Sequence, residues 1–206
     1  MSRCIAVINA GSSSIKFGLY EVGTESLLYR GKVEQIGVSP HLQVSDAKGA
    51  VVLERHWPAE NFDHCVATHV ILETGRALLA GSPVAGVGHR VVHGGMKYAL
   101  PTRVDRGVIA DLSELVPLAP LHQPHNLAPI ETIFDAAPQV PQVACFDTAF
   151  HRGQPEIAQL FALPRELTRS GIRRYGFHGL SYEYVTSHLP AIAPELADAR
   201  IVIAHL

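Results

Sequence analysis

Five short polar segments of this chain contain the residue types that bind and transfer charged groups. Four of them lie where a predicted strand or helix gives way to a loop, and begin at Asn9, Gly88, Leu121 and Phe146. The fifth begins at Arg173, in a loop that ends in glycines. Their amides, hydroxyls, guanidinium groups and imidazoles offer hydrogen-bond donors and positive charge where predicted strands or helices end. Such groups favour chemistry on an anion, and phosphate is the first candidate.

The first segment, residues 9–16, joins two predicted strands through an asparagine, a glycine and three serines. A tight turn this rich in small donors exposes backbone N–H groups and hydroxyls, which suits phosphate. An ordinary polar hairpin turn explains the same residues about equally well. The segment is not a Walker A loop, because the Gly-Lys pair and the following helix are both missing.

Two charged residues stand directly at the ends of apolar, strand-like runs. Arg90 lies beside glycines, where its guanidinium is well placed for bidentate contact with a carboxylate or a phosphate. Asp147 follows a buried strand, the usual position of a functional carboxylate in an open α/β sheet. The alternatives are a surface ion pair for Arg90 and a simple turn cap for Asp147.

The twelve histidines raise the possibility of a zinc site. Spacings that a zinc site could use occur in two pairs, His89 with His93 and His122 with His125. Asp147 or His151 could complete the site. A strand separates the first pair widely, however, and no His-Glu-x-x-His or Cys-x-x-Cys motif is present. A serine hydrolase is less favoured still, because the Gly-x-Ser-x-Gly motif is absent.

Apolar patterning predicts the elements that must position these segments. The predicted strands cover residues 4–8, 15–20, 26–33, 83–92, 140–146 and 200–206, with a small hairpin at 42–44 and 51–53. The predicted helices cover residues 63–79, 109–115, 126–137 and 181–189. Asn126 is the expected N-cap of the third helix, with Pro129 in its first turn.

The order of these elements indicates a mixed sheet in an α/β fold. Short links between the first three strands favour an antiparallel meander, and helical crossovers to the next two favour parallel pairing. This layout matches a five-stranded ribonuclease H-like domain of the actin type, although the pattern alone fits other α/β folds as well. We expect this domain to cover residues 1–150.

Composition limits the classes of function. Hydrophobic residues make up 47% of the chain and charged residues 17%, which is ample for a core. A net charge of −2 gives no sign of a nucleic-acid or membrane surface. Three cysteines at unrelated spacings indicate reduced thiols, and neither a signal peptide nor a membrane-length apolar run is found. We therefore expect a cytoplasmic protein with no nucleic-acid or membrane partner.

The last residues predict a buried strand at 200–206 that nothing afterwards covers. A native domain rarely ends on such an exposed edge. We therefore expect residues 151–206 to be the truncated beginning of a second, similar domain.

Taken together, six segments resemble the acetate kinase family, within the wider group of acetate, propionate and butyrate kinases. In chain order they are residues 7–17, 88–95, 119–126, 146–151, 173–179 and 203–206. The resemblance implies a fold similar to those of sugar kinases and actin. It also implies in-line phosphoryl transfer from ATP to acetate, giving acetyl phosphate and ADP, with Mg²⁺ or Mn²⁺ as cofactor and a homodimer as the full-length form.

The resemblance also assigns roles to individual residues. Arg90 would bind the carboxylate and the phosphoryl group, and Asp147 would be the catalytic carboxylate. The other implied roles are His122 and His178 at the transferring phosphoryl; Asn9, Ser12, Ser14, Lys16 and His205 at the phosphates; Asn9 and Asp147 at the metal; and Val92, Leu121 and Phe177 around the methyl group.

Two departures from the family pattern stand out. Gln123 replaces an asparagine found in many relatives, a change we expect to be tolerated. The family's chains are also much longer, so the nucleotide pocket and a second phosphate loop would lie after Leu206. We expect the 206-residue chain alone to be inactive. Propionate or butyrate kinase, and a non-catalytic carboxylate-binding module, remain as alternatives.

Overall fold

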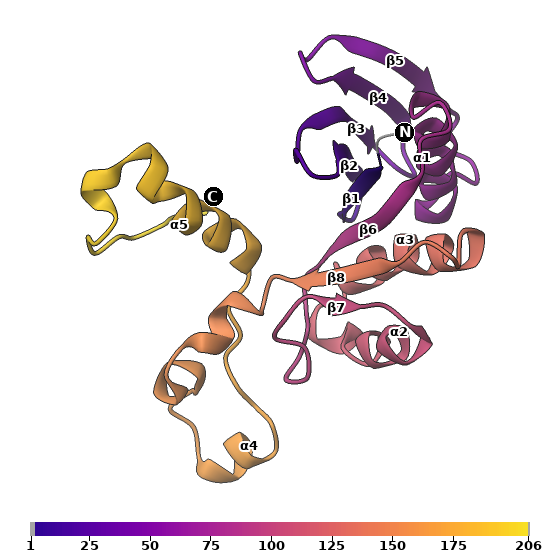
Figure 1. Cartoon of the computed structure of the whole chain (residues 1–206). Helices are drawn as coiled ribbons and strands as arrows, with labels where there is room; N and C mark the ends of the chain where they lie inside the picture. Colours follow the sequence, from indigo (N-terminus) through magenta and orange to yellow (C-terminus); the bar gives the residue numbers. More distant parts are fainter. Residues whose placement is uncertain (1–2, 206) are drawn as a thin grey trace.

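The computed structural model describes residues 3–205, and its main body is one mixed sheet with helices packed against it (Figure 1). The strands are β1 (Cys4–Ala10), β2 (Ile15–Glu21), β3 (Leu27–Glu34), β4 (His41–Asp46), β5 (Val51–His56), β6 (Val84–Val91), β7 (Thr102–Arg103) and β8 (Gln142–Phe146). The helices are α1 (His64–Leu78), α2 (Arg106–Ser113), α3 (Gln123–Ala136), α4 (Arg165–Arg169) and α5 (Gly179–Ile192).

The sheet has the order β5-β4-β3-β2-β1-β6-β8-β7. Strands β1 to β5 form an antiparallel meander, whereas β6 pairs parallel to β1, and β8 pairs parallel to β6. The five predicted strands therefore form the centre of the sheet in the predicted orientations. The predicted hairpin, β4 and β5, joins its meander edge, and the short β7 joins the opposite edge antiparallel to β8.

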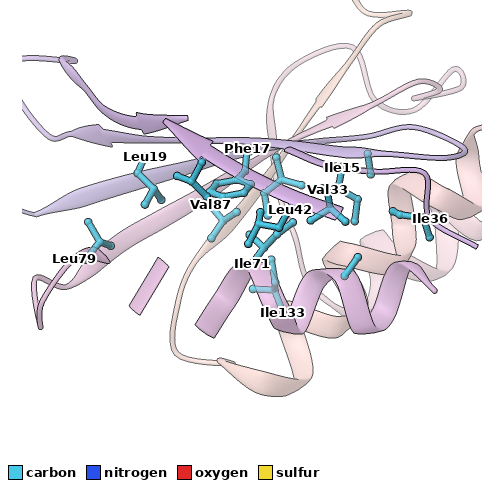
Figure 2. Close-up of a cluster of buried hydrophobic side chains, with 14 of the residues drawn as sticks. Ile15, Phe17, Leu19, Val33, Ile36, Leu42, Ile71, Leu79, Val87 and Ile133 are labelled. Carbon is cyan, nitrogen blue, oxygen red and sulfur yellow. The ribbon is translucent and has the colours of Figure 1, made fainter. Parts of the chain in front are cut away.

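Alternation along the strands places the apolar residues on the face that α1 and α3 cover. Phe17, Val33 and Leu42, from three neighbouring strands, are buried there against Ile71 of α1 and Ile133 of α3 (Figure 2). Burying each such side chain contributes about 1.5–3 kcal/mol. Asp63 caps α1 by accepting a hydrogen bond from the N–H of Val66 at 2.9 Å. This core holds β1 and β2, which carry the first polar segment.

A second cluster supports the strands that lead to Arg90 and Asp147. Val91 and Phe146 pack with Leu112 of α2 and Ile130 of α3, and all four are fully or almost fully buried. Helix α2 begins after Asp105, whose carboxylate accepts from the N–H of Val108 at 2.8 Å. The ends of β6 and β8 therefore stand on packed core.

One polar side chain, His89 of β6, lies in this interior at 2% exposure. Its Nε2 lies 2.7 Å from Oε1 of Gln142, and Nε2 of Gln142 donates to the carbonyl of Ile130 at 3.2 Å. Burial lowers the pKa of His89 to about 4, and the hydrogen bond to Gln142 opposes this shift only in part.

The buried His89 predicts a loss of stability in acid. The pKa of His89 is lower in the folded state, so between pH 6.5 and about 4 the unfolded chain binds the extra proton. The free energy of unfolding should therefore fall as pH falls through this window, by up to roughly 3 kcal/mol from this group. Urea unfolding at about pH 7 and about pH 4 measures it.

Comparing variants separates the contribution of His89 from that of the other titrating groups. His89→Gln should show a smaller fall than the wild type, whereas His69→Gln, at an exposed position of α1, should show the same fall. Equal pH dependence in all three proteins would contradict this assignment.

Helix α3 begins earlier than the sequence predicted. His122 is its N-cap residue without a side-chain capping bond, Pro124 lies in its first turn, and Pro129 lies inside the helix. The predicted cap, Asn126, is instead buried within the helix at 2% exposure. Its amide makes tertiary hydrogen bonds, described below, so it is not available to cap.

After β8 the chain leaves the sheet, and α4 and α5 lie away from it (Figure 1). The strand predicted at 200–206 is wrong for the described part: residues 200–205 have no regular structure, and Val202 is 95% exposed. Leu206 lies outside the described residues. A strand needs a neighbouring strand to pair its N–H and C=O groups, and none lies beside 200–205 within the part described.

Candidate active site

The site lies at the carboxyl-terminal ends of three adjacent strands, β1, β6 and β8. Asn9 lies near the end of β1, Arg90 near the end of β6, and Asp147 directly after β8. The parallel registers align Ile8 with His89 and Arg90 with Cys145. The carboxyl ends of parallel strands are the usual binding edge of an open α/β sheet.

Arg90 is held between the other two side chains. Its Nε and Nη2 donate to the same carboxylate oxygen, Oδ2 of Asp147, at 3.0 and 2.5 Å. Its Nη1 donates to Oδ1 of Asn9 at 3.1 Å. The Asp147 side chain is 2% exposed, whereas the Arg90 side chain is 29% exposed. The guanidinium is therefore held by Asp147 and Asn9, and it remains partly accessible to a ligand.

Two buried amides of α3 fix the backbone around Arg90. Asn126 accepts from the N–H of Val92 at 2.8 Å and donates to the carbonyl of Ala10 at 2.6 Å, which ties β6 to β1. Gln123 accepts from the N–H of His93 at 3.1 Å and donates to its carbonyl at 3.0 Å. Sequence reasoning missed both roles, although both residues stand in the segment that begins at Leu121.

The first polar segment is a closed turn. The N–H of Gly11 donates to the carbonyl of Ser14 at 2.7 Å, and Nε2 of His64 donates to the carbonyl of Gly11 at 2.7 Å. Ser12 and Lys16 are exposed and Ser14 is half-buried, so the polar groups of the turn face solvent. Lys16 pairs directly with Asn9 across β1 and β2. No sequence motif pointed to His64.

Asp147 also anchors the segment that contains His178. The N–H of Gly179, the first residue of α5, donates to the Asp147 carbonyl at 2.9 Å. His151 donates from Nε2 to the carbonyl of Phe177 at 2.9 Å. His178 lies between these two anchors in the left-handed region, with φ of 57°. Backbone contacts therefore bring His178 to the edge where Arg90 and Asp147 lie.

The imidazole of His178 is exposed and stacks on His205, with ring centroids 4.1 Å apart. Partial desolvation and then the neighbouring His205 lower the pKa of His178, and Asp147 opposes this shift. Arg90 and His122 add smaller contributions that lower it further. His178 is therefore mainly neutral at neutral pH and available as a hydrogen-bond donor.

The residues expected around a methyl group are gathered only in part. Val92 is buried, whereas Leu121 is 73% and Phe177 38% exposed. The ring of Phe177 lies 5.9 Å from that of His93, the neighbour of Val92. His122 is exposed at the start of α3. The structure therefore joins Asn9, Arg90 and Asp147 by direct bonds and leaves Leu121 and His122 on the open side of the site.

The first of the two histidine pairs that suggested zinc, His89 with His93, is engaged elsewhere. His89 bonds to Gln142 inside the core, and Nδ1 of His93 accepts from the N–H of Gly95 at 2.9 Å. In residues 3–205 no three His, Cys, Asp or Glu side chains are grouped as a metal site requires. Neither does any helix of this part combine the length and hydropathy needed to cross a membrane.

The sequence of this chain is similar to those of known proteins. The model of the Acetokinase family matches residues 4–206. An acetate kinase from Rhodopseudomonas palustris is 47% identical over 211 residues, covering 100% of this chain and 53% of its own. The chain spans about half the length of the curated relatives it matches.

Two solved structures share the fold. The acetate kinase of Porphyromonas gingivalis has a TM-score of 0.79 at 36% identity, covering 94% of this chain and 49% of its own. A propionate kinase from Francisella tularensis has a TM-score of 0.82 at 31% identity, covering 94% of this chain and 50% of its own. The fold is therefore the ribonuclease H-like fold expected from the sequence.

Proposed function

Because the chain belongs to the acetokinase family, we propose that it forms the acetate-binding part of an acetate kinase, which transfers a phosphoryl group from ATP to acetate. The observation that carries this proposal is Arg90, held by Asn9 and Asp147 with its guanidinium partly open to solvent. An oriented guanidinium suits both the planar carboxylate of acetate and the oxygens of a phosphoryl group.

The chemical step follows from these groups. A carboxylate oxygen of acetate attacks the terminal phosphorus of ATP in line, the bond to the bridging oxygen breaks, and ADP leaves with its electron pair. Acetate is already ionised at neutral pH, so the site must orient it and need not remove a proton. Arg90, His122 and His178 would stabilise the negative charge on the equatorial oxygens. The phosphate oxygens of ATP would meet Ser12, Ser14, Lys16 and His205.

A divalent cation fits this site through two residues. Asp147 bonds to Arg90 through Oδ2, so its other oxygen would be the one to coordinate the cation, and Oδ1 of Asn9, which accepts from Arg90, would be the second ligand. Mg²⁺ usually takes one or two protein ligands and completes its shell with phosphate oxygens and water. Mg²⁺ or Mn²⁺ would neutralise charge on the phosphates, and Asp147 would both hold it and position acetate.

The organisation of the whole protein belongs to the same proposal. Residues 1–150 would form the first domain, and residues 151–206 would begin the nucleotide-binding domain, in keeping with the departure of the chain from the sheet after β8. We further propose a cytoplasmic homodimer. A propionate or butyrate kinase is the second candidate, favoured by the propionate kinase of similar fold.

A fusion protein tests the proposal. It joins this chain at Leu206 to the remaining portion of the Rhodopseudomonas palustris relative, which is 47% identical over the shared part. We expect ATP-dependent acetyl phosphate formation by the fusion protein with Mg²⁺ and none by the 206-residue chain alone. Comparing kcat/KM for acetate, propionate and butyrate decides the acceptor.

Three other results would change the conclusion. A fusion protein that folds but phosphorylates none of the three acids would contradict the kinase proposal. If the fusion protein were inactive in this way and the chain alone bound acetate by calorimetry, the carboxylate-binding module would be favoured. Robust turnover by the 206-residue chain alone would overturn the division of the site between two parts.

A further inference from the structure

A positively charged cavity lies beside the candidate active site, where Thr148 directly follows Asp147. It has a volume of about 260 Å³ and is lined by Thr148, His151, Arg152, Gln154, Gln159, Arg174, Tyr175 and Gly176. Neither aspartate nor glutamate is among these lining residues, and two of them are arginines. The volume lies just below the range of roughly 300–1,000 Å³ typical for drug-sized ligands, so it suits a small ion.

The guanidinium of Arg152 is incompletely bonded in this cavity. Within residues 3–205, its Nε is the one buried side-chain nitrogen or oxygen that has no hydrogen-bond partner. Its Nη1 donates to Oε1 of Gln159 at 3.3 Å and lies 2.9 Å from the sulfur of Met96. A buried N–H group without an acceptor costs about 1–3 kcal/mol, and more when the group is charged.

The acceptor that Arg152 does have is shared. Oε1 of Gln159 also accepts from Nη1 of Arg173 at 3.5 Å, so one neutral amide serves two guanidinium groups. Among the described residues, neither of these arginines nor Arg174 forms an ion pair. Arg152 and Arg173, which share one amide oxygen, repel each other, and a bound anion would relieve this repulsion.

We propose that this cavity is a binding site for a small oxyanion, inorganic phosphate or a short carboxylate, held by Arg152 and Arg174. The guanidinium of Arg152 must turn for binding, because its Nε, which no protein group satisfies, is closed to solvent in this structure. It then donates to the oxyanion, and Arg174 pairs with the charge of the ion. Gln154 and Tyr175 supply further polar groups at the wall.

This site is separate from the one at Arg90. Thr148 lines the cavity and directly follows Asp147 of the candidate active site. Its hydroxyl oxygen accepts from the N–H of Gly94 at 3.0 Å. Tyr175 packs its ring edge-on against His93, with centroids 4.4 Å apart. The oxyanion site therefore adjoins the walls of the candidate active site without using Arg90, and it does not rest on the proposed function.

The Nε–H resonance of Arg152 provides a local test. Nuclear magnetic resonance of the 206-residue chain, selective for arginine Nε–H groups, would follow titration with inorganic phosphate, and a second titration would use acetate. Sodium chloride at matched ionic strength controls for screening. We expect phosphate to shift the Arg152 resonance in a saturable way that chloride does not reproduce. The acetate titration shows whether a carboxylate is accepted as well.

Variants separate this site from other anion contacts. Arg152→Gln and Arg174→Gln should each weaken phosphate binding about tenfold or more, since each removes charge-assisted hydrogen bonds. Arg169→Gln, at an exposed position of α4, should not weaken it. Arg90→Gln should leave the Arg152 shift in place. Thermal melting checks that each variant is folded, and Arg152→Lys, which retains the charge without the Nε–H, should bind more weakly than the wild type.

Three results would overturn the proposal. They are an Arg152 resonance that phosphate does not move, phosphate affinity that is equal in Arg152→Gln and Arg169→Gln, and a shift that disappears in Arg90→Gln. The last result would place the bound anion at the candidate active site instead. Loss of acetate phosphorylation in the fusion protein alone would not affect this proposal.

Discussion

Replacing Arg90 by glutamine should lower kcat/KM for acetate in the fusion protein by about 100-fold or more. Arg90 has the one guanidinium that the structure fixes between Asn9 and Asp147, and two of its nitrogens hold a single carboxylate oxygen. Glutamine is neutral and shorter, so it neither pairs with acetate nor stabilises charge on the transferring phosphoryl. Steady-state kinetics over a range of acetate concentrations measures the effect.

The same substitution should destabilise the chain itself. Without Arg90, the Asp147 carboxylate would be buried at 2% side-chain exposure without a cation. Removing one partner of a buried ion pair costs on the order of 3 kcal/mol, because the remaining charge is left uncompensated. Asp147→Asn should restore part of this loss when combined with Arg90→Gln. Urea unfolding of the two single variants and the double variant would give the coupling energy.

The control is another Arg–Asp pair in the same protein. Arg106 donates to Asp135 at 2.6 Å, but their side chains are 67% and 64% exposed. Exposed pairs contribute about 0–1 kcal/mol, so Arg106→Gln should change stability little and kcat/KM not at all. If Arg90→Gln behaved like Arg106→Gln, the assignment of Arg90 to substrate binding would be wrong.

The part of this site that could be predicted is the part that local pattern determines. Arg90 and Asp147 stand at the ends of apolar runs, and the link lengths between strands indicate which strands are parallel. These features predict that each residue lies at the end of a strand, and the structure brings the two strand ends together so that Arg90 and Asp147 are in direct contact. The extra strands β4 and β5 were predicted as a hairpin, but sequence alone did not show that they extend the same sheet.

The features that were missed depend on contacts between distant parts of the chain. Asn126 bonds to Ala10 across 116 residues, and His64 bonds to Gly11 across 53. An asparagine near a helix start has the same local signature whether it caps the helix or bridges two strands. The run at 200–206 likewise has the composition of a strand, but it forms one only beside a partner strand. The local sequence pattern predicts which structures a segment can form, and contacts with distant parts of the chain determine which of them it adopts.

Replacing Gly179 by alanine should have the second large effect. A Cβ atom at this position would overlap the carbonyl oxygen of Asp147 and the Cβ of Phe150. The overlap with Asp147 involves backbone, so a side-chain rotation cannot relieve it. The start of α5 must then move, and the hydrogen bond from the Gly179 N–H to Asp147 is strained or lost. We expect a loss of about 1–3 kcal/mol in the free energy of unfolding.

The larger consequence is for catalysis, because Gly179 follows His178 directly. A displacement of about 1 Å in a positioned group can cost on the order of 100-fold in rate, and we expect a loss of this size in kcat of the fusion protein. Gly153→Ala is the matched control, since nothing lies within 4 Å of its added Cβ. If both alanine variants kept wild-type kcat, the contact between α5 and Asp147 would not position His178. Loss of kcat in Gly179→Ala alone, with the variant still folded, would show that the backbone link to Asp147 joins the two halves of the site.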